Sequence, residues 1–276
     1  MKTIIYIITL ISLVFSNAAN SAEFKTTPLF SKDGSETGKR FTLMGEIKRG
    51  DADRLATYIF SNRHWIESVD LNSPGGNIQE AMIMGELIRA ARLETYVQPG
   101  QTCASACFII WINGVNRAAF PDVPFKNQKT GQTSYSRLGL HRPYMMTIDN
   151  DDKSLSNQAK AMQSVDTYLA ERRIPRRLID QMMSRGSNDI YWVNQDDVDE
   201  IGQSPYDLEE LYITKCNDNR KKLYSQITFA RRNGNNDLES ILNDTIAKIN
   251  GCIDDLNREA RRKAIGEKFK TQLRIN

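Results

Sequence analysis

The sequence predicts an α/β fold, with a parallel β-sheet covered by helices and a C-terminal α-helical hairpin after it. Short apolar segments with strand-like alternation are separated by segments whose apolar residues recur at helical spacing, and the connections are short. That order is typical of a parallel sheet with helices on its faces. Beyond residue 207 the strand pattern stops and Lys, Arg, Asn and Asp become frequent, which indicates a separate helical region.

The expected elements follow a polar stretch over residues 23–40, which we interpret as an N-terminal arm. Alternating apolar residues predict strands over residues 41–47, 66–71, 94–97, 117–120, 138–143 and 191–193. Helical spacing predicts helices over residues 51–60, 78–92, 154–184 and 195–201, the third of them broken at Ile174-Pro175. The polar loop over residues 121–136 is either a surface insertion or a cover for a cleft.

The first 22 residues have the pattern of a secretory signal peptide. Lys2 precedes an apolar run from Ile4 to Phe15, and small residues follow as far as Ala22. The run is shorter than the roughly 20 residues that a membrane-spanning helix needs. We therefore expect a periplasmic or secreted protein, and an uncleaved N-terminal membrane anchor is the alternative.

Four cysteines fit this expectation of export. An even number in an oxidising compartment predicts two disulfides. Cys103 and Cys107 are four residues apart, a helical rise of roughly 6 Å that a disulfide tolerates. Cys216 and Cys252 stand at equal distances from Gly234, so a hairpin turning at Gly234 would bring them together. The alternative is a metal site made of the first pair and a histidine, for which no fourth ligand is visible. We expect no metal.

Ser105 stands between small residues at the start of an apolar run. Small neighbours permit a sharp turn, and a turn into a helix would aim the hydroxyl and the first free N–H groups at one spot. This arrangement suits a nucleophile. It also suits a tightly packed helix start without chemistry.

Three motifs in order bear on that choice: Ser73-Pro74-Gly75-Gly76, Cys103-Ala104-Ser105-Ala106-Cys107 and Leu140-His141-Arg142-Pro143. With Gly45 on the first strand, they resemble the ClpP branch of the ClpP/crotonase superfamily over roughly residues 41–205. The resemblance is nearest to exported ClpP-like proteins, and it implies the repeated β-β-α superhelix of that superfamily. The expected organisation is a signal peptide (1–22), an N-terminal arm (23–40), a ClpP/crotonase-like domain (41–207), and a helical hairpin with a basic tail (208–276).

The resemblance implies a role for each matching residue. Ser105 would be the nucleophile and His141 the general base, with an oxyanion site formed by backbone N–H groups of Gly75, Gly76 and Ala106. The chemistry agrees, since a serine hydroxyl needs a base to remove its proton, and glycines let the backbone approach an oxyanion. The only other histidine, His64, stands at an expected helix-to-strand junction, where we expect a structural role.

The third member of the triad departs from the family pattern. Counting back from Gly202 without a gap puts Ile190 where the family has an aspartate, and Asp189 is one residue away. Asp189 is therefore the candidate after a local shift. Asn188 is the alternative, because orienting an imidazole needs only an acceptor.

The C-terminal segment from Cys216 to Cys252 resembles a second family, of small exported helical proteins of unknown function. This second resemblance implies a fold and a compartment, and no activity.

The sequence thus leads us to expect an exported serine hydrolase, a ClpP-like peptidase that cleaves short or unfolded peptides without a cofactor or an ATPase partner. The net charge of +3 gives no reason to expect nucleic acid as a partner. Oligomerisation of the chain with itself is expected by resemblance. Two alternatives stay open: an inactive binding or scaffold protein that keeps the fold, and an acyl-CoA enzyme using the same oxyanion loop. Export argues against the second, because the cofactor is cytoplasmic.

Overall fold

The computed structural model describes residues 21–30, 34–62, 66–144, 152–186, 188–202 and 206–272. All but the last two residues of the expected signal peptide lie outside these ranges. The strands are β1 (Glu23–Phe30), β2 (Glu36–Met44), β3 (Ile66–Asn72), β4 (Glu94–Val97), β5 (Thr102–Ala104), β6 (Arg117–Ala119), β7 (Phe125–Lys126), β8 (Thr133–Ser134), β9 (Arg137–Leu140) and β10 (Tyr191–Trp192). The helices are α1 (Asp51–Ser61), α2 (Ile78–Ala90), α3 (Ala106–Trp111), α4 (Asp152–Glu171), α5 (Arg176–Ser184), α6 (Gln195–Ile201), α7 (Tyr206–Cys216), α8 (Arg220–Arg232) and α9 (Asn236–Gln272).

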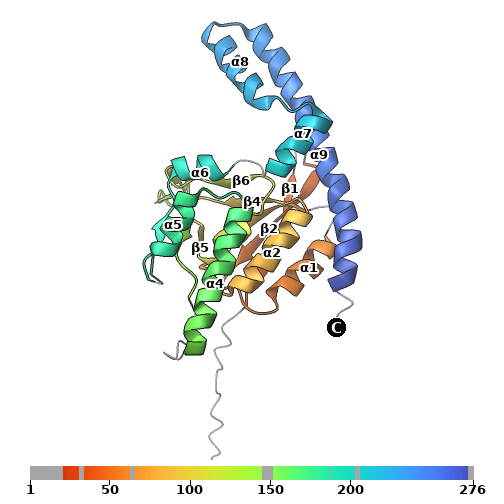
Figure 1. Ribbon diagram of the computed structural model, residues 1–276. Helices are drawn as coiled ribbons and strands as arrows, with labels where there is room; N and C mark the ends of the chain where they lie inside the picture. Colours follow the sequence, from red (N-terminus) through yellow and green to blue (C-terminus); the bar gives the residue numbers. More distant parts are fainter. Residues whose placement is uncertain are drawn as a thin grey trace, which may run out of the picture.

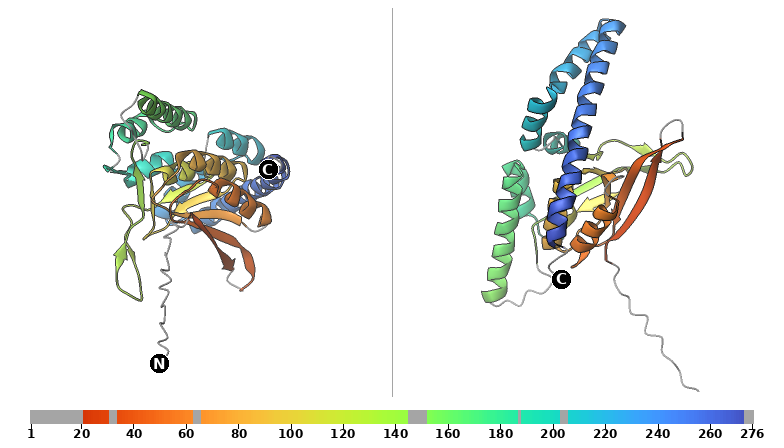
Figure 2. Two further views of the ribbon diagram at one scale, coloured as in Figure 1. Left: turned by 90° about the horizontal axis from the view of Figure 1, so that it is seen from below. Right: turned by 90° about the vertical axis from the view of Figure 1, so that its right-hand side faces the viewer.

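The main sheet has five strands in the order β1-β2-β3-β4-β6. Strands β2, β3, β4 and β6 are parallel, and β1 adds to one edge in the antiparallel direction. Helices α1, α2, α4 and α9 lie on one side of the sheet, while the ribbon of β1 and β2 projects toward the other (Figure 2). The alternation of strands and helices in the sequence therefore corresponds to a mixed α/β fold with a parallel sheet.

The N-terminal arm expected over residues 23–40 is instead ordered as β1 and the first half of β2. The sequence of this segment lacks the apolar alternation of a strand, because a two-stranded ribbon exposes much of both faces and can carry polar residues on each. The ring of Tyr58 holds the base of the ribbon, since Phe24 and Phe41 pack against it with ring centroids 5.8 Å and 5.4 Å away. Pro28 is tolerated in β1 because an edge strand can spare one N–H.

A second sheet, in the order β10-β9-β5, continues from the first. Parallel bridges join Ser73 to Cys103 and Ile47 to Gly76. The chain that follows β3 therefore reaches β5, where the Ser105 segment begins. This junction brings the glycine motif and the serine motif together.

Helix α3 forms the centre of the core. All six of its residues are fully buried, and the helix is apolar on every side, as a helix surrounded by protein must be. The side chain of Asn113, just beyond its end, donates to the Tyr168 hydroxyl of α4 at 2.8 Å. The polar loop over residues 121–136 holds β7 and β8, which pair as an exposed ribbon on the surface.

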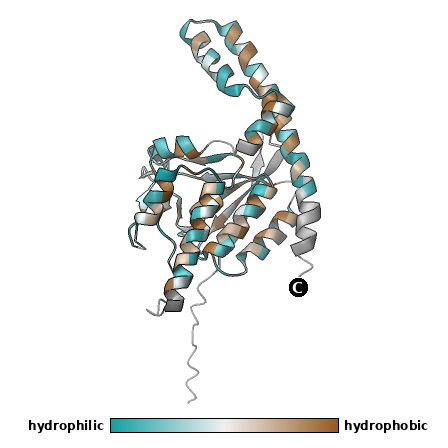
Figure 3. Ribbon diagram, in the orientation of Figure 1, coloured by the Kyte–Doolittle hydropathy of each residue, from teal (hydrophilic) through white to brown (hydrophobic). Residues whose placement is uncertain are grey.

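Helices α7, α8 and α9 extend beyond the sheet, with α8 and the first part of α9 side by side (Figure 1). The chain turns between α8 and α9 at Gly234, whose φ is +65°. Hydrophobic and hydrophilic residues alternate along both helices (Figure 3), and a second core fills the space between the helices: Leu223, Ile227, Leu242, Ile246, Ile249 and Ile253.

The C-terminal helices are also tied to the main sheet layer. Arg261 of α9 is buried, and its guanidinium donates to the carbonyl of Ala91 at 3.0 Å and to that of Arg92 at 3.3 Å. These carbonyls end helix α2, where a cation is favourable. Asn257 accepts hydrogen bonds from both Arg92 and Tyr212. Helix α9 therefore bridges the two parts of the molecule.

Both expected disulfides are present, Cys103–Cys107 and Cys216–Cys252, with Cα atoms 5.2 Å and 5.8 Å apart. They indicate an oxidising compartment. Within the described ranges, we find no helix that combines the length and the apolar character needed to cross a membrane.

Candidate active site

Ser105 lies at a sharp turn between β5 and α3. Its backbone has φ 57° and ψ −124°, a region that residues other than glycine rarely occupy. A strained serine between a strand and a helix is the geometry that presents a nucleophilic hydroxyl in many hydrolases. The residue is partly exposed, whereas Ala104 and Ala106 on either side are buried. The turn therefore projects the Ser105 side chain out of an otherwise closed core.

Two interactions hold this turn in place. The N–H of Ser105 donates to the carbonyl of Gly139 on β9 at 2.9 Å. The Cys103–Cys107 disulfide joins the strand before the turn to the first helical turn after it, and both cysteines are fully buried. The strained conformation is thus fixed on one side by a neighbouring strand and across its base by a covalent bond.

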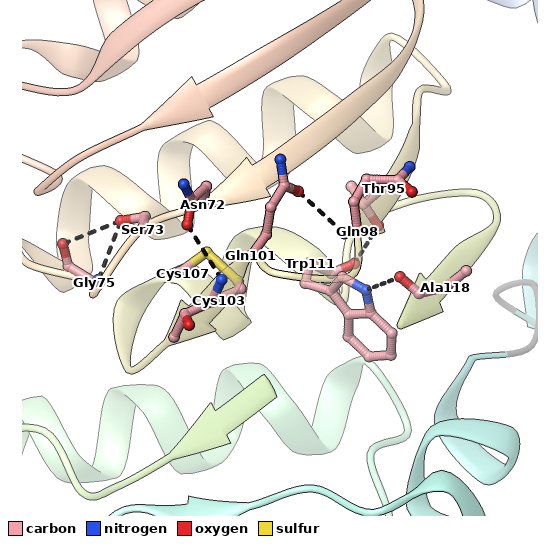
Figure 4. The surroundings of a disulfide bond; sticks show 11 residues. Asn72, Ser73, Gly75, Thr95, Gln98, Gln101, Cys103, Cys107, Trp111 and Ala118 are labelled. Carbon is pink, nitrogen blue, oxygen red and sulfur yellow. Dashed lines mark hydrogen bonds between the residues drawn. A yellow bond between two sulfur atoms is a disulfide. The ribbon is translucent and has the colours of Figure 1, made fainter. Parts of the chain in front are cut away.

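The glycine motif packs directly against Ser105. Gly75 has φ +100°, and a Cβ on it would lie 2.7 Å from the Cβ of Ser105 and 2.9 Å from the nitrogen of Ala106. Only glycine fits there. The hydroxyl of Ser73 accepts the N–H of Gly75 at 3.1 Å, beside the disulfide (Figure 4). The Gly75 N–H, expected as an oxyanion donor, therefore already has an acceptor.

Gly76 and Ala106 differ from Gly75 in this respect. The backbone of Ile47 bonds to both neighbours of Gly76, donating to the carbonyl of Gly75 and accepting from Asn77, each at 2.8 Å. In a parallel bridge this leaves the N–H of Gly76 directed away from Ile47. The N–H of Ala106 is the first of α3, so it has no acceptor within the helix. Among the described residues, these two N–H groups make no backbone hydrogen bond.

His141 follows β9, the parallel neighbour of β5. Gly139 pairs with Ala104, so His141 and Ser105 both lie just beyond the carboxyl ends of adjacent strands. The imidazole is largely buried, and its Nδ1 lies 2.9 Å from the carbonyl oxygen of Arg142. A carbonyl only accepts, so Nδ1 carries the proton, and Nε2 of the neutral ring keeps a lone pair. The Tyr144 ring packs against the imidazole, with centroids 5.5 Å apart.

Asp189 has a different partner. Its carboxylate is 61% exposed and pairs with Arg185, whose Nη1 lies 3.0 Å from Oδ2. Asn188 is exposed as well. Within the described residues, no hydrogen bond joins His141 to Asp189 or to Ser105. The backbone of Arg142, which the sequence did not suggest, is what orients the ring.

Comparisons with known proteins give little beyond this geometry. No protein-family model matches the chain. No curated protein matches it. Among solved structures, a mutant of ClpP1 from Listeria monocytogenes resembles it with a TM-score of 0.43 and 15% identity, over 58% of this chain and 86% of the other.

One buried carboxylate lies near the same junction. Asp70 on β3 is 6% exposed, accepts from Gln98 at 3.1 Å and faces the guanidinium of Arg40 at 3.6 Å. Burial raises the pKa of Asp70, and the two partners counteract part of that rise. Asn72, two residues after Asp70 on β3, accepts the N–H of Thr102 at the start of β5. This polar row braces the strand that leads to Ser105.

A cavity of about 710 Å³ lies elsewhere, between the C-terminal helices and the ends of the sheet. Its lining includes Glu94, Tyr212, Arg220 and Asn257, and none of the expected site residues. Within the described ranges, no three side chains of the metal-ligating kinds gather in one place. The structure therefore brings together Ser105, Gly75, Gly76 and Ala106, sets His141 on the adjoining strand, and leaves Asp189 with Arg185.

Proposed function

We propose that this chain is a serine hydrolase acting on peptides, with Ser105 as the nucleophile and His141 as the general base. The observation that carries the proposal is the strained backbone of Ser105, packed against Gly75. A non-glycine residue in such a conformation costs about 1 to 3 kcal/mol and persists only where its surroundings enforce it. A helix start that serves packing alone needs no such strain.

The reaction follows from these positions. Nε2 of His141 removes the proton of Ser105 as Oγ attacks the carbonyl carbon of the substrate. The carbonyl oxygen becomes negative and accepts the N–H groups of Gly76 and Ala106. When the C–N bond breaks, the imidazolium gives its proton to the leaving amine, and a water molecule then releases the acyl group by the reverse sequence. No hydrogen bond links Ser105 and His141 in the described residues, and we expect one to form when substrate binds.

The Arg142 carbonyl replaces a carboxylate as the group that orients His141. A carbonyl fixes the tautomer that a general base requires. It stabilises the imidazolium less than a full negative charge would, so we expect slow turnover compared with enzymes that have a complete Ser-His-Asp triad.

The expected compartment restricts the class of peptides that can be substrates. Disulfides indicate an oxidising environment, and the apolar N-terminal segment acts in this proposal as a cleaved signal peptide. ATP-driven unfolding is not available there, so the substrates are short or already unfolded peptides. Association of several copies of the chain is part of the proposal and would be measured by sedimentation.

A fluorophosphonate probe tests the proposal. We expect the wild type to be labelled at Ser105, Ser105→Ala to be unlabelled, and His141→Ala to react about 100-fold more slowly. Asp189→Ala should react at the wild-type rate, since its carboxylate pairs with Arg185. A folded wild type that the probe does not label would count against hydrolysis.

A peptide-binding protein without turnover is the second candidate, favoured by the separation of Asp189 from His141. Peptide binding that persists in Ser105→Ala, together with no hydrolysis by either form, would support it.

A further inference from the structure

Trp192 and Arg137 form a pair beside the turn that holds Ser105. Trp192 on β10 stands opposite Gly139 on β9, and a Cβ on Gly139 would lie 2.7 Å from the indole ring. The missing side chain of Gly139 therefore lets the indole lie directly over the strand. The carbonyl of Gly139 is also the acceptor for the N–H of Ser105.

The pair lies on the face of β9 opposite the core. Side chains alternate along β9, and Leu138 and Leu140 point into the core with 0% and 1% exposure. Arg137 and Gly139 take the opposite face, and His141 follows directly after the strand ends at Leu140. An extended continuation of the strand would place the imidazole on the same side of the sheet as the indole.

The charge of Arg137 has no partner of opposite sign in the described part of the chain. Its guanidinium carbon lies 3.8 Å from the centre of the indole ring, a cation–π contact, and no ion pair involves it. By contrast, three arginines that precede β10 in the sequence all pair with carboxylates: Arg176, Arg177 and Arg185. Both Arg137 and Trp192 are exposed, the latter by 36%.

We propose that Arg137 and Trp192 form a substrate subsite that binds a carboxylate near the scissile bond. A guanidinium held over an indole keeps N–H groups available in a planar fork, which matches a carboxylate in two-point geometry. The indole offers an apolar surface to the atoms that carry the carboxylate. This subsite rests on the proposed function, because the scissile bond is the one that Ser105 attacks.

The spacing sets where the carboxylate stands in the substrate. Gly139 and His141 are two residues apart, about 7 Å along an extended strand. The carboxylate therefore belongs to a residue about two positions from the scissile bond. An acidic side chain and the free carboxyl end of a short peptide have the same chemistry at that distance.

Binding to Ser105→Ala tests the subsite without turnover. The probes are two matched pairs of fluorescent peptides. In one pair, a Glu in the first peptide is replaced by Gln in the second. In the other pair, the first peptide has a free C-terminal carboxylate and the second has a C-terminal amide. We expect the carboxylate member of at least one pair to bind about tenfold more tightly. Adding Arg137→Gln should abolish that difference, and adding Trp192→Leu should weaken binding of both members. The pair that discriminates identifies which kind of carboxylate is bound.

Arg176→Gln is the matched control, since Arg176 is an exposed arginine with its own acidic partners and should keep the preference. Equal binding of acidic and neutral peptides, or a preference that survives Arg137→Gln, overturns the subsite. Because the fluorophosphonate probe lacks a carboxylate, labelling of Ser105 reports separately on hydrolysis. Labelling of Ser105 without a preference for carboxylate peptides would rule out the subsite alone. A preference for carboxylate peptides without labelling would rule out hydrolysis and leave a carboxylate-binding site.

Discussion

A Cβ atom on Gly75 would lie 2.7 Å from the Cβ of Ser105, closer than two such carbons approach in folded proteins. The glycine motif and the serine turn therefore fit together only when position 75 has no side chain. Gly75 is also in a left-handed conformation, with φ +100°. The contact and the backbone angle both require glycine at position 75.

Gly75→Ala should displace the loop that carries the N–H of Gly76. We expect the rate of fluorophosphonate labelling to fall about 100-fold or more, as it does when an oxyanion donor is lost. Gly251→Ala is the control, because Gly251 has open space around it in α9. There alanine should add about 0.5 to 1 kcal/mol of stability and leave labelling unchanged. A folded Gly75→Ala protein that reacts normally would show that the contact is packing alone.

The Cys103–Cys107 disulfide closes a loop of only four residues, so it adds little to global stability, about 2 kcal/mol in the chain-entropy estimate. Replacing both cysteines by alanine should instead lower labelling of Ser105 severalfold, because the strained turn loses its brace. The measurement is the labelling rate at a temperature where both proteins are folded.

The Cys216–Cys252 disulfide should behave in the opposite way. It spans 36 residues, and removing it should cost about 4 kcal/mol of stability with no change in labelling. Thermal unfolding and labelling of Cys216→Ala/Cys252→Ala check the two parts. Equal effects of the two double variants on labelling would contradict a local role for the first disulfide.

Asp70 makes stability depend on pH. Burial raises its pKa above the ordinary value, so the folded protein holds this proton more tightly than the unfolded chain does. This contribution is fully present at acid pH and is lost as pH rises through the folded pKa. Asp70→Asn keeps an acceptor for Gln98 and removes the titration. In denaturant titrations, the unfolding free energy of Asp70→Asn should therefore rise relative to that of the wild type as pH increases above the ordinary aspartate pKa of about 4. A difference that stays constant with pH would contradict this assignment.

Arg261→Met should loosen the attachment of α9. The substitution keeps an apolar side chain and leaves the carbonyls of Ala91 and Arg92 without their donor, at a cost of about 2 to 3 kcal/mol. Limited proteolysis should then cleave within the last turns of α9. Arg258→Met, one turn earlier on an exposed face, should change stability by less than about 0.5 kcal/mol. Similar proteolysis of the two variants would count against the attachment.

Much of the sheet was predictable because its pattern is local. The strand before Asn72, the helix after Gly76 and the strand ending at Val97 carry apolar periodicity that survives without tertiary context. The cysteine pairings were predictable from the spacing of the four cysteines together with the expected export. The turn at Ser105 was predictable from its small neighbours.

Other features depend on contacts distant in sequence. Strand β5 has three residues, too few for alternation, and exists through its pairing with β9. The carbonyl of Arg142 leaves no trace in the sequence, since every residue has one. The role of Trp192 needs the register that sets it against Gly139. Asp189 stood one residue from the family position, and spacing could not reveal that Arg185, four residues earlier, would pair with its carboxylate.

Helix α9 is continuous over 37 residues, roughly 55 Å. Its C-terminal part is attached to the end of α2 through Arg261, and its N-terminal part extends with α8 beyond the edge of the sheet (Figure 1). A rod of this kind has a set length and a set direction. The outer end of α8 is therefore held at a fixed distance from Ser105, and the length of α9 sets that distance.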